Sequence, residues 1–219
     1  AERVINASLK PATVNYVGYG LDSIWTQIYY HVWWPGQGND PMYLANTSMN
    51  RTRNNYYGNN YTPHMFTNGK DSGSNTTNWK NDPKGYLNDV SLYGVRISGI
   101  QSGNDISFDV ELNAVKSTSS SRDLRLFIAT VMDTVKYDKS PNGLLVHHNA
   151  VIDLLTGDTG KSIKLISGAV TKESFSWSMR TEWINHSDLT YNMSGLKVVA
   201  WIQDYSNKEI LQVNELNFD

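Results

Sequence analysis

The second half of the chain is a series of short segments in which polar and apolar residues alternate, most clearly at residues 94–100 and 105–112. Alternation with a period of two indicates β-strands, because successive side chains of a strand point to opposite faces of the sheet. Turn sequences separate the segments, as at residues 102–105 and 141–143. Segments with this spacing predict an antiparallel β-sandwich. The further strands expected are residues 124–132, 144–155, 162–170, 173–179, 196–204 and 209–214.

The first third of the chain alternates between strand and helix patterns instead. A short strand at residues 4–7 precedes a weakly amphipathic helix at about residues 14–25. Residues 26–34 are aromatic and β-branched and end at Pro35-Gly36, which predicts a buried central strand. We therefore expect an α/β domain at residues 1–86 and an all-β domain at residues 87–219.

Residues 40–85 contain clear start and stop signals. Asp40-Pro41 provides an N-cap and a proline at the first helical position of a helix over residues 42–57, which Gly58 would end. A strand at residues 62–68 should reverse at Asn68-Gly69, since this dipeptide is typical of a tight turn. Residues 70–85 are polar and predict a loop or a short helix around residues 76–79.

Composition excludes several classes of partner. The 219 residues carry a formal net charge of −2, and the basic residues are scattered, so a nucleic-acid-binding surface is not expected. No apolar run is long enough for a membrane span. The chain begins at Ala1 with a strand-like segment, and its polar residues are mostly Asn, Ser, Thr and Tyr. These features favour a mature exported protein, either secreted or at the cell surface.

Short motifs in both halves of the chain resemble one known family. In the first half they are Asn6-Ala7-Ser8, Trp34-Pro35-Gly36, Asp40-Pro41-Met42-Tyr43, Arg53 with Tyr56-Tyr57, and Thr62-Pro63 with Asn68-Gly69. In the second half they are residues 124–132, Pro141-Asn142-Gly143, His147, and residues 198–204 with 208–212. Their order resembles exported thioredoxin-like proteins of Bacteroidota, of the 28-kDa outer-membrane-protein type, which carry a C-terminal β-sandwich.

This resemblance implies a thioredoxin-like domain at residues 1–86 and an immunoglobulin-like sandwich at residues 87–219. It also places Leu9 and Ala12 at the two redox cysteine positions. The chain contains no cysteine, and thiol-disulfide exchange needs a thiolate, so that chemistry is absent. In the same frame Pro63 is expected to follow a cis peptide bond, where a bound peptide is conceivable but a structural turn is the simpler interpretation.

The first domain is rich in aromatic residues. Tyr and Trp side chains suit both protein interfaces and sugar stacking, because each ring contributes a large contact area at a small entropic cost. The candidate interface or ligand residues are Trp33, Trp34, Tyr43, Tyr56, Tyr57 and Tyr61.

No motif predicts a catalytic residue, a metal site or a cofactor. The chain has five histidines, but no zinc-binding spacing, and no Gly-x-Ser-x-Gly sequence. His31 is expected to be an ordinary buried residue. His147 and His148 alternate along a strand, so they cannot bind one metal together. Loops at residues 36–40 and 102–105 offer oxygen atoms that suit calcium, although plain turns are the simpler interpretation.

Three functional hypotheses follow. The first is a non-enzymatic, exported structural subunit that forms a homopolymer such as a fibre or surface layer. The second is a monomeric surface protein that binds a glycan or a peptide. The third is a thiol-disulfide oxidoreductase from which the cysteines were removed.

Overall fold

The computed structural model describes residues 26–34, 36, 38–140 and 143–218. The expected strand at residues 4–7, the expected helix at residues 14–25, and both Leu9 and Ala12 lie outside the described residues. None of the helices in the described ranges is long and apolar enough to cross a membrane.

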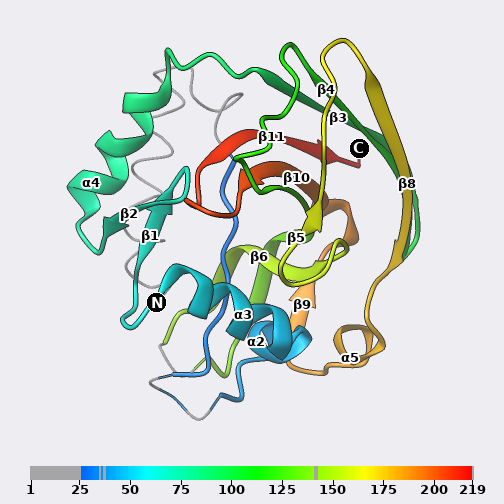
Figure 1. Ribbon diagram of the computed structural model, residues 1–219. Helices are drawn as coiled ribbons and strands as arrows, with labels where there is room; N and C mark the ends of the chain where they lie inside the picture. The colour runs from blue at the N-terminus through cyan, green and yellow to red at the C-terminus, as the bar shows by residue number, and fades with distance from the viewer. Residues whose placement is uncertain (1–25, 35, 37, 141–142, 219) are drawn as a thin grey trace.

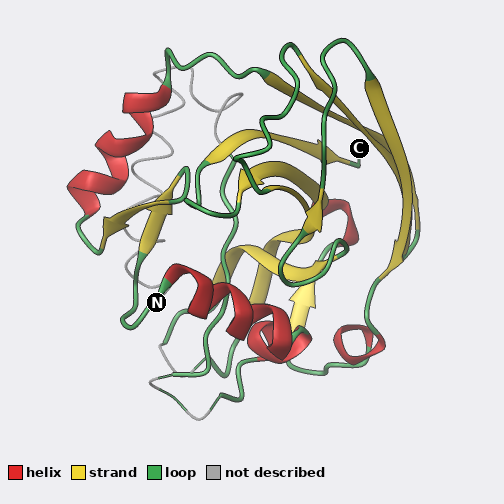
Figure 2. Ribbon diagram, in the orientation of Figure 1, coloured by secondary structure: helices red, strands yellow, loops and turns green. Residues whose placement is uncertain are grey.

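The described chain is mostly β-structure, with a few short helices (Figures 1 and 2). The helices are α2 (Pro41–Ala45), α3 (Thr47–Tyr57), α4 (Thr76–Asn81) and α5 (Thr181–Ile184), with 3-10 turns η1 (Asp82–Tyr86) and η2 (Met193–Gly195). The strands are β1 (Met65–Thr67), β2 (Lys70–Gly73), β3 (Tyr93–Ser102), β4 (Asp105–Ala114), β5 (Leu124–Tyr137), β6 (Val146–Leu154), β7 (Lys161–Ser162), β8 (Val170–Ser178), β9 (Leu189–Tyr191), β10 (Leu196–Asp204) and β11 (Ile210–Asn217).

These strands form three antiparallel sheets. The largest has the order β11-β10-β5-β6, and β7 and β9 also pair with β5. The second has the order β3-β4-β8, and the third is the hairpin β1-β2. In Figure 1 the β3-β4-β8 sheet lies at the right, β1, β2 and α4 lie at the left, and the largest sheet lies between them. The predicted antiparallel β-structure of the second half is confirmed.

The strand expected at residues 162–170 is wrong, because only the two residues of β7 form a strand there. The strand expected at residues 173–179 is confirmed as β8, which begins three residues earlier. The residues between β7 and β8 form a loop. The carbonyl of Leu165 in this loop accepts a bond from the amide of Thr118, and the amide of Gly168 donates to the carbonyl of Ala114. In this loop Leu165 packs into the core while Ile166 is exposed, and neither continues a ladder.

The largest sheet is buried on both faces. One face packs against the β3-β4-β8 sheet and includes Leu126 and Ile128 of β5. The other face includes Phe127 of β5 and Trp201 of β10, and it packs against Met49 of α3. All nine residues of β10 are buried, so its sequence is a nearly continuous apolar run, without the alternation of a half-exposed strand.

The predicted central strand at residues 26–34 is wrong. Only Tyr29 forms a β-bridge, in parallel with Ala150 of β6. The amide of Tyr29 donates to the carbonyl of Asn149 at 2.8 Å, and the amide of Val151 donates to the carbonyl of Tyr29 at 3.0 Å. Two residues later, the amide of His31 bonds to the side chain of Asn50 in α3. The segment therefore crosses from the edge of β6 to the helix and does not form a ladder.

Within described residues 26–86, the only sheet is the hairpin β1-β2. The central sheet expected of an α/β domain is not observed there. Helices α2 and α3 lie against the β11-β10-β5-β6 sheet instead, and α4 contacts β2 and η1.

The helix predicted at residues 42–57 is two helices. Its backbone breaks at Asn46, whose φ of −152° is extended. The Asn46 side chain accepts a bond from the amide of Met49 at 3.0 Å and donates to Asp153 of β6 at 2.8 Å. Asn46 thus caps α3 and ties it to the sheet, which a purely local helix signal does not reveal.

The predicted stops at Gly58 and Asn68-Gly69 are confirmed. Gly58 ends α3 with a φ of 67°, and residues 68 and 69 join β1 to β2. The turn at Gly69 also lies against the turn between β10 and β11, where a Cβ atom would be 1.7 Å from the carbonyl oxygen of Lys208. Glycine is required at this position by both its φ of 85° and the close approach.

Candidate ligand-binding site

Two of the six predicted aromatic residues pack inside the chain. The ring of Tyr56 stacks on Tyr205 at 4.3 Å, and its hydroxyl donates to the Tyr205 carbonyl at 3.0 Å. The hydroxyl of Tyr57 accepts a bond from Gln203 at 3.0 Å, and its ring contacts Phe66. Both residues hold α3 against neighbouring parts of the chain, so they do not form a free interface.

The other four lie in two places. Trp33, Trp34 and Tyr43 lie together, with the Trp33 ring 6.4 Å from Trp34 and 5.9 Å from Tyr43. Tyr61 lies apart from them, is 40% exposed, and stacks on His64. The structure therefore divides the aromatic residues into an internal pair, a cluster of three and one exposed ring.

A cavity of about 510 Å³ adjoins the cluster of three. Its wall includes Trp33, Tyr43, Leu44, Thr47, Ser48 and Arg51. Its volume falls in the range of small-molecule sites, roughly 300 to 1,000 Å³. The break between α2 and α3 forms this cavity, because it lets residues of both short helices face a common space.

The position of Trp33 depends on the segment that leads into α2. The ring of buried His31 lies 2.8 Å from the carboxylate of Asp40, which also accepts a bond from the amide of Met42 at 2.8 Å. Burial by itself would raise the pKa of Asp40, but the charge and hydrogen bond of His31 outweigh it, so that the pKa is lowered. Asp40 is therefore an ionised cap, and the segment that carries Trp33 is anchored at both ends.

Arg51 is the one charged residue among the described residues of the cavity wall. Arg51 donates from Nε to the hydroxyl of Tyr43 at 2.6 Å, and its guanidinium carbon lies 5.0 Å from the centre of the Trp33 ring. Both contacts hold the guanidinium at the wall. The exposed Leu44 adds an apolar surface, and Thr47 and Ser48 add hydroxyls; that of Ser48 donates to Asp158. The site combines a cation, aromatic surface and hydroxyl groups.

The neighbouring arginine of the same helix has a different environment. Arg53 is only 2% exposed, and its guanidinium lies 4.4 Å from the ring of Phe127 and 4.9 Å from that of Tyr56. It donates to the side-chain oxygen of Gln203 at 3.1 Å. Burial raises the pKa of the nearby Tyr30 to about 12, so this hydroxyl stays neutral. Arg53 is an internal structural residue.

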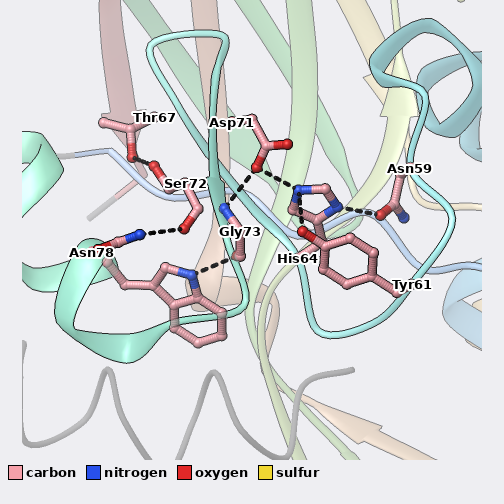
Figure 3. A network of polar contacts seen from close by, with 9 residues as sticks. Asn59, Tyr61, His64, Thr67, Asp71, Ser72, Gly73 and Asn78 are labelled. Carbon is pink, nitrogen blue, oxygen red and sulfur yellow. Dashed lines mark hydrogen bonds and ion pairs between the residues drawn. The ribbon is translucent and has the colours of Figure 1, made fainter.

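A second polar cluster surrounds His64 (Figure 3). Its Nδ1 lies 2.8 Å from the side-chain oxygen of Asn59, and its Nε2 lies 2.7 Å from Asp71 and 3.1 Å from the hydroxyl of Tyr61. The hydrogen bond with His64 is the main cause that lowers the pKa of Asp71. Asp71 also accepts a bond from the amide of Gly73 at 2.7 Å. The cluster fastens the loop at residues 59–64 to β2, which is a structural role.

The remaining sequence candidates have the following positions. The Thr62–Pro63 peptide bond is cis, as predicted. His31 is buried, and His147 is the cross-strand partner of Val135 with a pKa lowered to about 4, mainly by burial. Within the described ranges, no group of three or more His, Cys, Asp or Glu side chains could hold a metal ion.

No local sequence pattern distinguishes Arg51 or the residues of the His64 cluster as site residues. Arg51 belongs to a helix with mostly polar residues, and the contacts that distinguish it come from Trp33 and Tyr43, which are eighteen and eight residues away. A local signal was present only for the aromatic partners.

No protein-family model matches the sequence, and no curated protein matches it. Solved structures do show similarity. A domain of the outer-membrane lipoprotein Omp28 from Porphyromonas gingivalis is 8% identical, with a TM-score of 0.41, over 59% of this chain and 90% of that chain. A DUF3823 family protein from Bacteroides ovatus is 14% identical, with a TM-score of 0.30, over 58% of this chain and 56% of that chain.

A β-glucosidase from Kluyveromyces marxianus is 11% identical, with a TM-score of 0.31, over 59% of this chain but only 14% of that chain. At these identities the similarities concern the fold alone. All three TM-scores are below 0.5, so the β-sheet class of the chain rests on its own antiparallel sheets.

Proposed function

We propose that this chain is a non-enzymatic bacterial surface protein that binds a glycan in the cavity between α2, α3 and Trp33. The observation that carries the proposal is the grouping of Trp33, Tyr43 and Arg51 around one cavity of about 510 Å³. Export and a surface location are parts of the proposal that rest on the polar composition and on the family resemblance.

The wall of the cavity suits a sugar in two respects. A sugar ring offers an apolar C–H face and a rim of hydroxyls, and Trp33 with Leu44 provides apolar surface while Thr47 and Ser48 provide hydroxyls. The rings of Tyr43 and Trp33 are fixed by their neighbours before a ligand arrives, which reduces the entropic cost of binding.

The experiment compares two aromatic substitutions. Trp33→Ala removes one aromatic ring of the cavity wall, and we expect it to weaken binding of a glycan identified in the screen by at least tenfold, because aromatic anchors dominate such sites. Tyr61→Ala is the matched control, because it removes an exposed ring that does not line the cavity. Binding is measured by screening the protein against immobilised glycans and then by calorimetry. Equal loss in both variants, or no glycan bound by the native chain, contradicts the proposal.

Self-assembly is a second candidate, and strand β8 favours it. In β8 the register with β4 leaves the amides of residues 172, 174 and 176 on the side away from β4, and no described residue pairs with that side. Val170, at its start, is 64% exposed. A free edge of this kind can accept a strand from a second copy.

The matching test substitutes Ser176→Pro. Its amide lies on the free edge, so proline removes a donor for a partner strand and leaves the bonds to β4 in place. If β8 mediates assembly, native chain should form concentration-dependent oligomers in light scattering and the variant should be monomeric. A native chain that is monomeric at millimolar concentration excludes this candidate.

The thioredoxin-like origin of residues 1–86 and the immunoglobulin-like class of the sandwich are also hypotheses within this proposal. The order of α3, the hairpin β1-β2 and α4 supports the first of these, and the packing of two antiparallel sheets supports the second. Under this hypothesis the first domain lost its redox chemistry and kept its role as a packing layer.

A further inference from the structure

The guanidinium of Arg51 has unused hydrogen-bonding capacity at the cavity wall. Its Nε donates to Tyr43, but within the described part of the chain neither terminal nitrogen has an acceptor, and no carboxylate forms an ion pair with it. Five N–H donors in a fixed plane suit a two-pronged contact with a carboxylate. The charge is already held in place by Tyr43 and Trp33, so binding an anion would require little reordering.

Two backbone amides at the start of α3 reinforce the same preference. Thr47 and Ser48 both line the cavity, and the described residues provide no acceptor for either amide. The Asn46 cap occupies the next amide, that of Met49. The first amides of a helix carry partial positive charge, so they add to the field of Arg51.

Among the described residues that line the cavity, Arg51 is basic and none is acidic, so their net charge is positive. Asp158 accepts a bond from the Ser48 hydroxyl but is not itself one of the described lining residues. A neutral sugar would make no ion pair with Arg51, whereas a carboxylate would add a charge-assisted contact.

We infer that the cavity selects a sugar that carries a carboxylate, such as a uronic acid or a sialic acid. The carboxylate would bind Arg51 and the amides of Thr47 and Ser48, while the ring of the sugar lies along Trp33 and Leu44. This inference rests on the proposed glycan-binding function and specifies the class of glycan.

The test uses free sugars in calorimetry at low salt. The acidic probes are glucuronate, galacturonate and N-acetylneuraminate, and the neutral probes are glucose, galactose and N-acetylglucosamine; inorganic phosphate tests a simple anion. Arg51→Gln removes the charge and Arg51→Lys keeps it without the planar fork. Arg96→Gln is the control, because it removes one exposed charge from β3, which does not line the cavity.

We expect at least one acidic sugar to bind at least tenfold more tightly than its neutral counterpart. Arg51→Gln should abolish this difference, Arg51→Lys should reduce it severalfold, and Arg96→Gln should preserve it. Affinity should also fall as salt is added, because the contact is partly exposed. As a control, thermal unfolding of each variant should give a melting temperature close to that of the native chain, which would show that the fold is retained.

Three results would overturn the inference, and they separate it from the proposed function. Equal binding of acidic and neutral sugars, unchanged in Arg51→Gln, refutes the carboxylate preference and leaves glycan binding in place. Binding of phosphate as tight as that of the acidic sugars refutes the role of the sugar ring. Binding of no glycan by the native chain refutes the proposed function itself.

Discussion

The two faces of the β11-β10-β5-β6 sheet are held by different kinds of contact. The face toward β3-β4-β8 is a layer of apolar side chains such as Leu126 and Phe108. The face toward α3 mixes apolar Phe127 with two buried polar groups, Arg53 and Gln203. Apolar packing tolerates small shifts, whereas hydrogen bonds fix direction. The polar contacts therefore determine where α3 lies on the sheet, and the cavity beside Arg51 depends on that placement.

The largest expected loss of stability comes from a substitution in the apolar face. Leu126 is fully buried, so Leu126→Ala should remove about 4 kcal/mol from the free energy of unfolding through lost transfer energy and a residual cavity. Leu126→Met conserves volume and should cost less than about 1.5 kcal/mol. Urea unfolding monitored by circular dichroism measures both. A loss near zero for the alanine variant would show that this face is loosely packed.

The next largest effect is a pH dependence of the free energy of unfolding, which we expect from one face of the sheet and not from the other. His147 shares the face of Val135, and burial lowers its pKa from 6.5 to about 4. The unfolded chain therefore binds a proton at a higher pH than the folded chain, and the stabilising effect of neutral His147 is lost as pH falls from about 6.5 to about 4. The full loss is on the order of 3 kcal/mol.

Urea unfolding at a series of pH values should show this slope in the native chain and a weaker slope in His147→Phe. Arg53 lies on the other face of the sheet, so Arg53→Met should leave the slope unchanged. An equal slope in the native chain and His147→Phe would show that the pH dependence does not come from His147.

The smallest effect concerns the polar contact itself. Arg53 donates to Gln203 at 3.1 Å, and hydrogen bonds that involve a charged group contribute about 1.5 to 3 kcal/mol. A double-mutant cycle with Arg53→Met and Gln203→Met should give a coupling energy of about 1.5 kcal/mol. Effects that add within about 0.5 kcal/mol would show that the contact does not fix α3.

The sequence predicted the sandwich strands better than the outer layer, for a physical reason. Strands with one exposed face alternate between polar and apolar residues, as β4 does, so they can be recognised from a short stretch of sequence. The segment at residues 26–34 has the composition of a buried strand, but only Tyr29 pairs with β6, while Ile28 and Tyr30 pack against the apolar cluster between the sheet and α3. Burial by itself does not distinguish these two arrangements. The break at Asn46 was equally hidden, since it depends on Asp153, more than one hundred residues away.

The candidate site was predicted only in part. The aromatic composition identified Trp33 and Tyr43, but it also included Tyr56 and Tyr57, which pack internally. Two arginines two residues apart in α3 have opposite environments, one at a cavity and one in the interior. The packing of α3 on the sheet determines that Arg51 lies at the cavity and Arg53 in the interior.

A sheet that is buried on both faces also constrains how relatives of this chain can differ. Phe127, Val199 and Trp201 are apolar because α3 and the segment before it cover them. A sandwich that lost this covering layer in evolution would expose a large aromatic patch to water and would aggregate unless these positions became polar. Polar residues at the three positions in a related sequence would thus identify a sandwich that is free on this side, and aromatic residues there would identify one that still carries a covering layer.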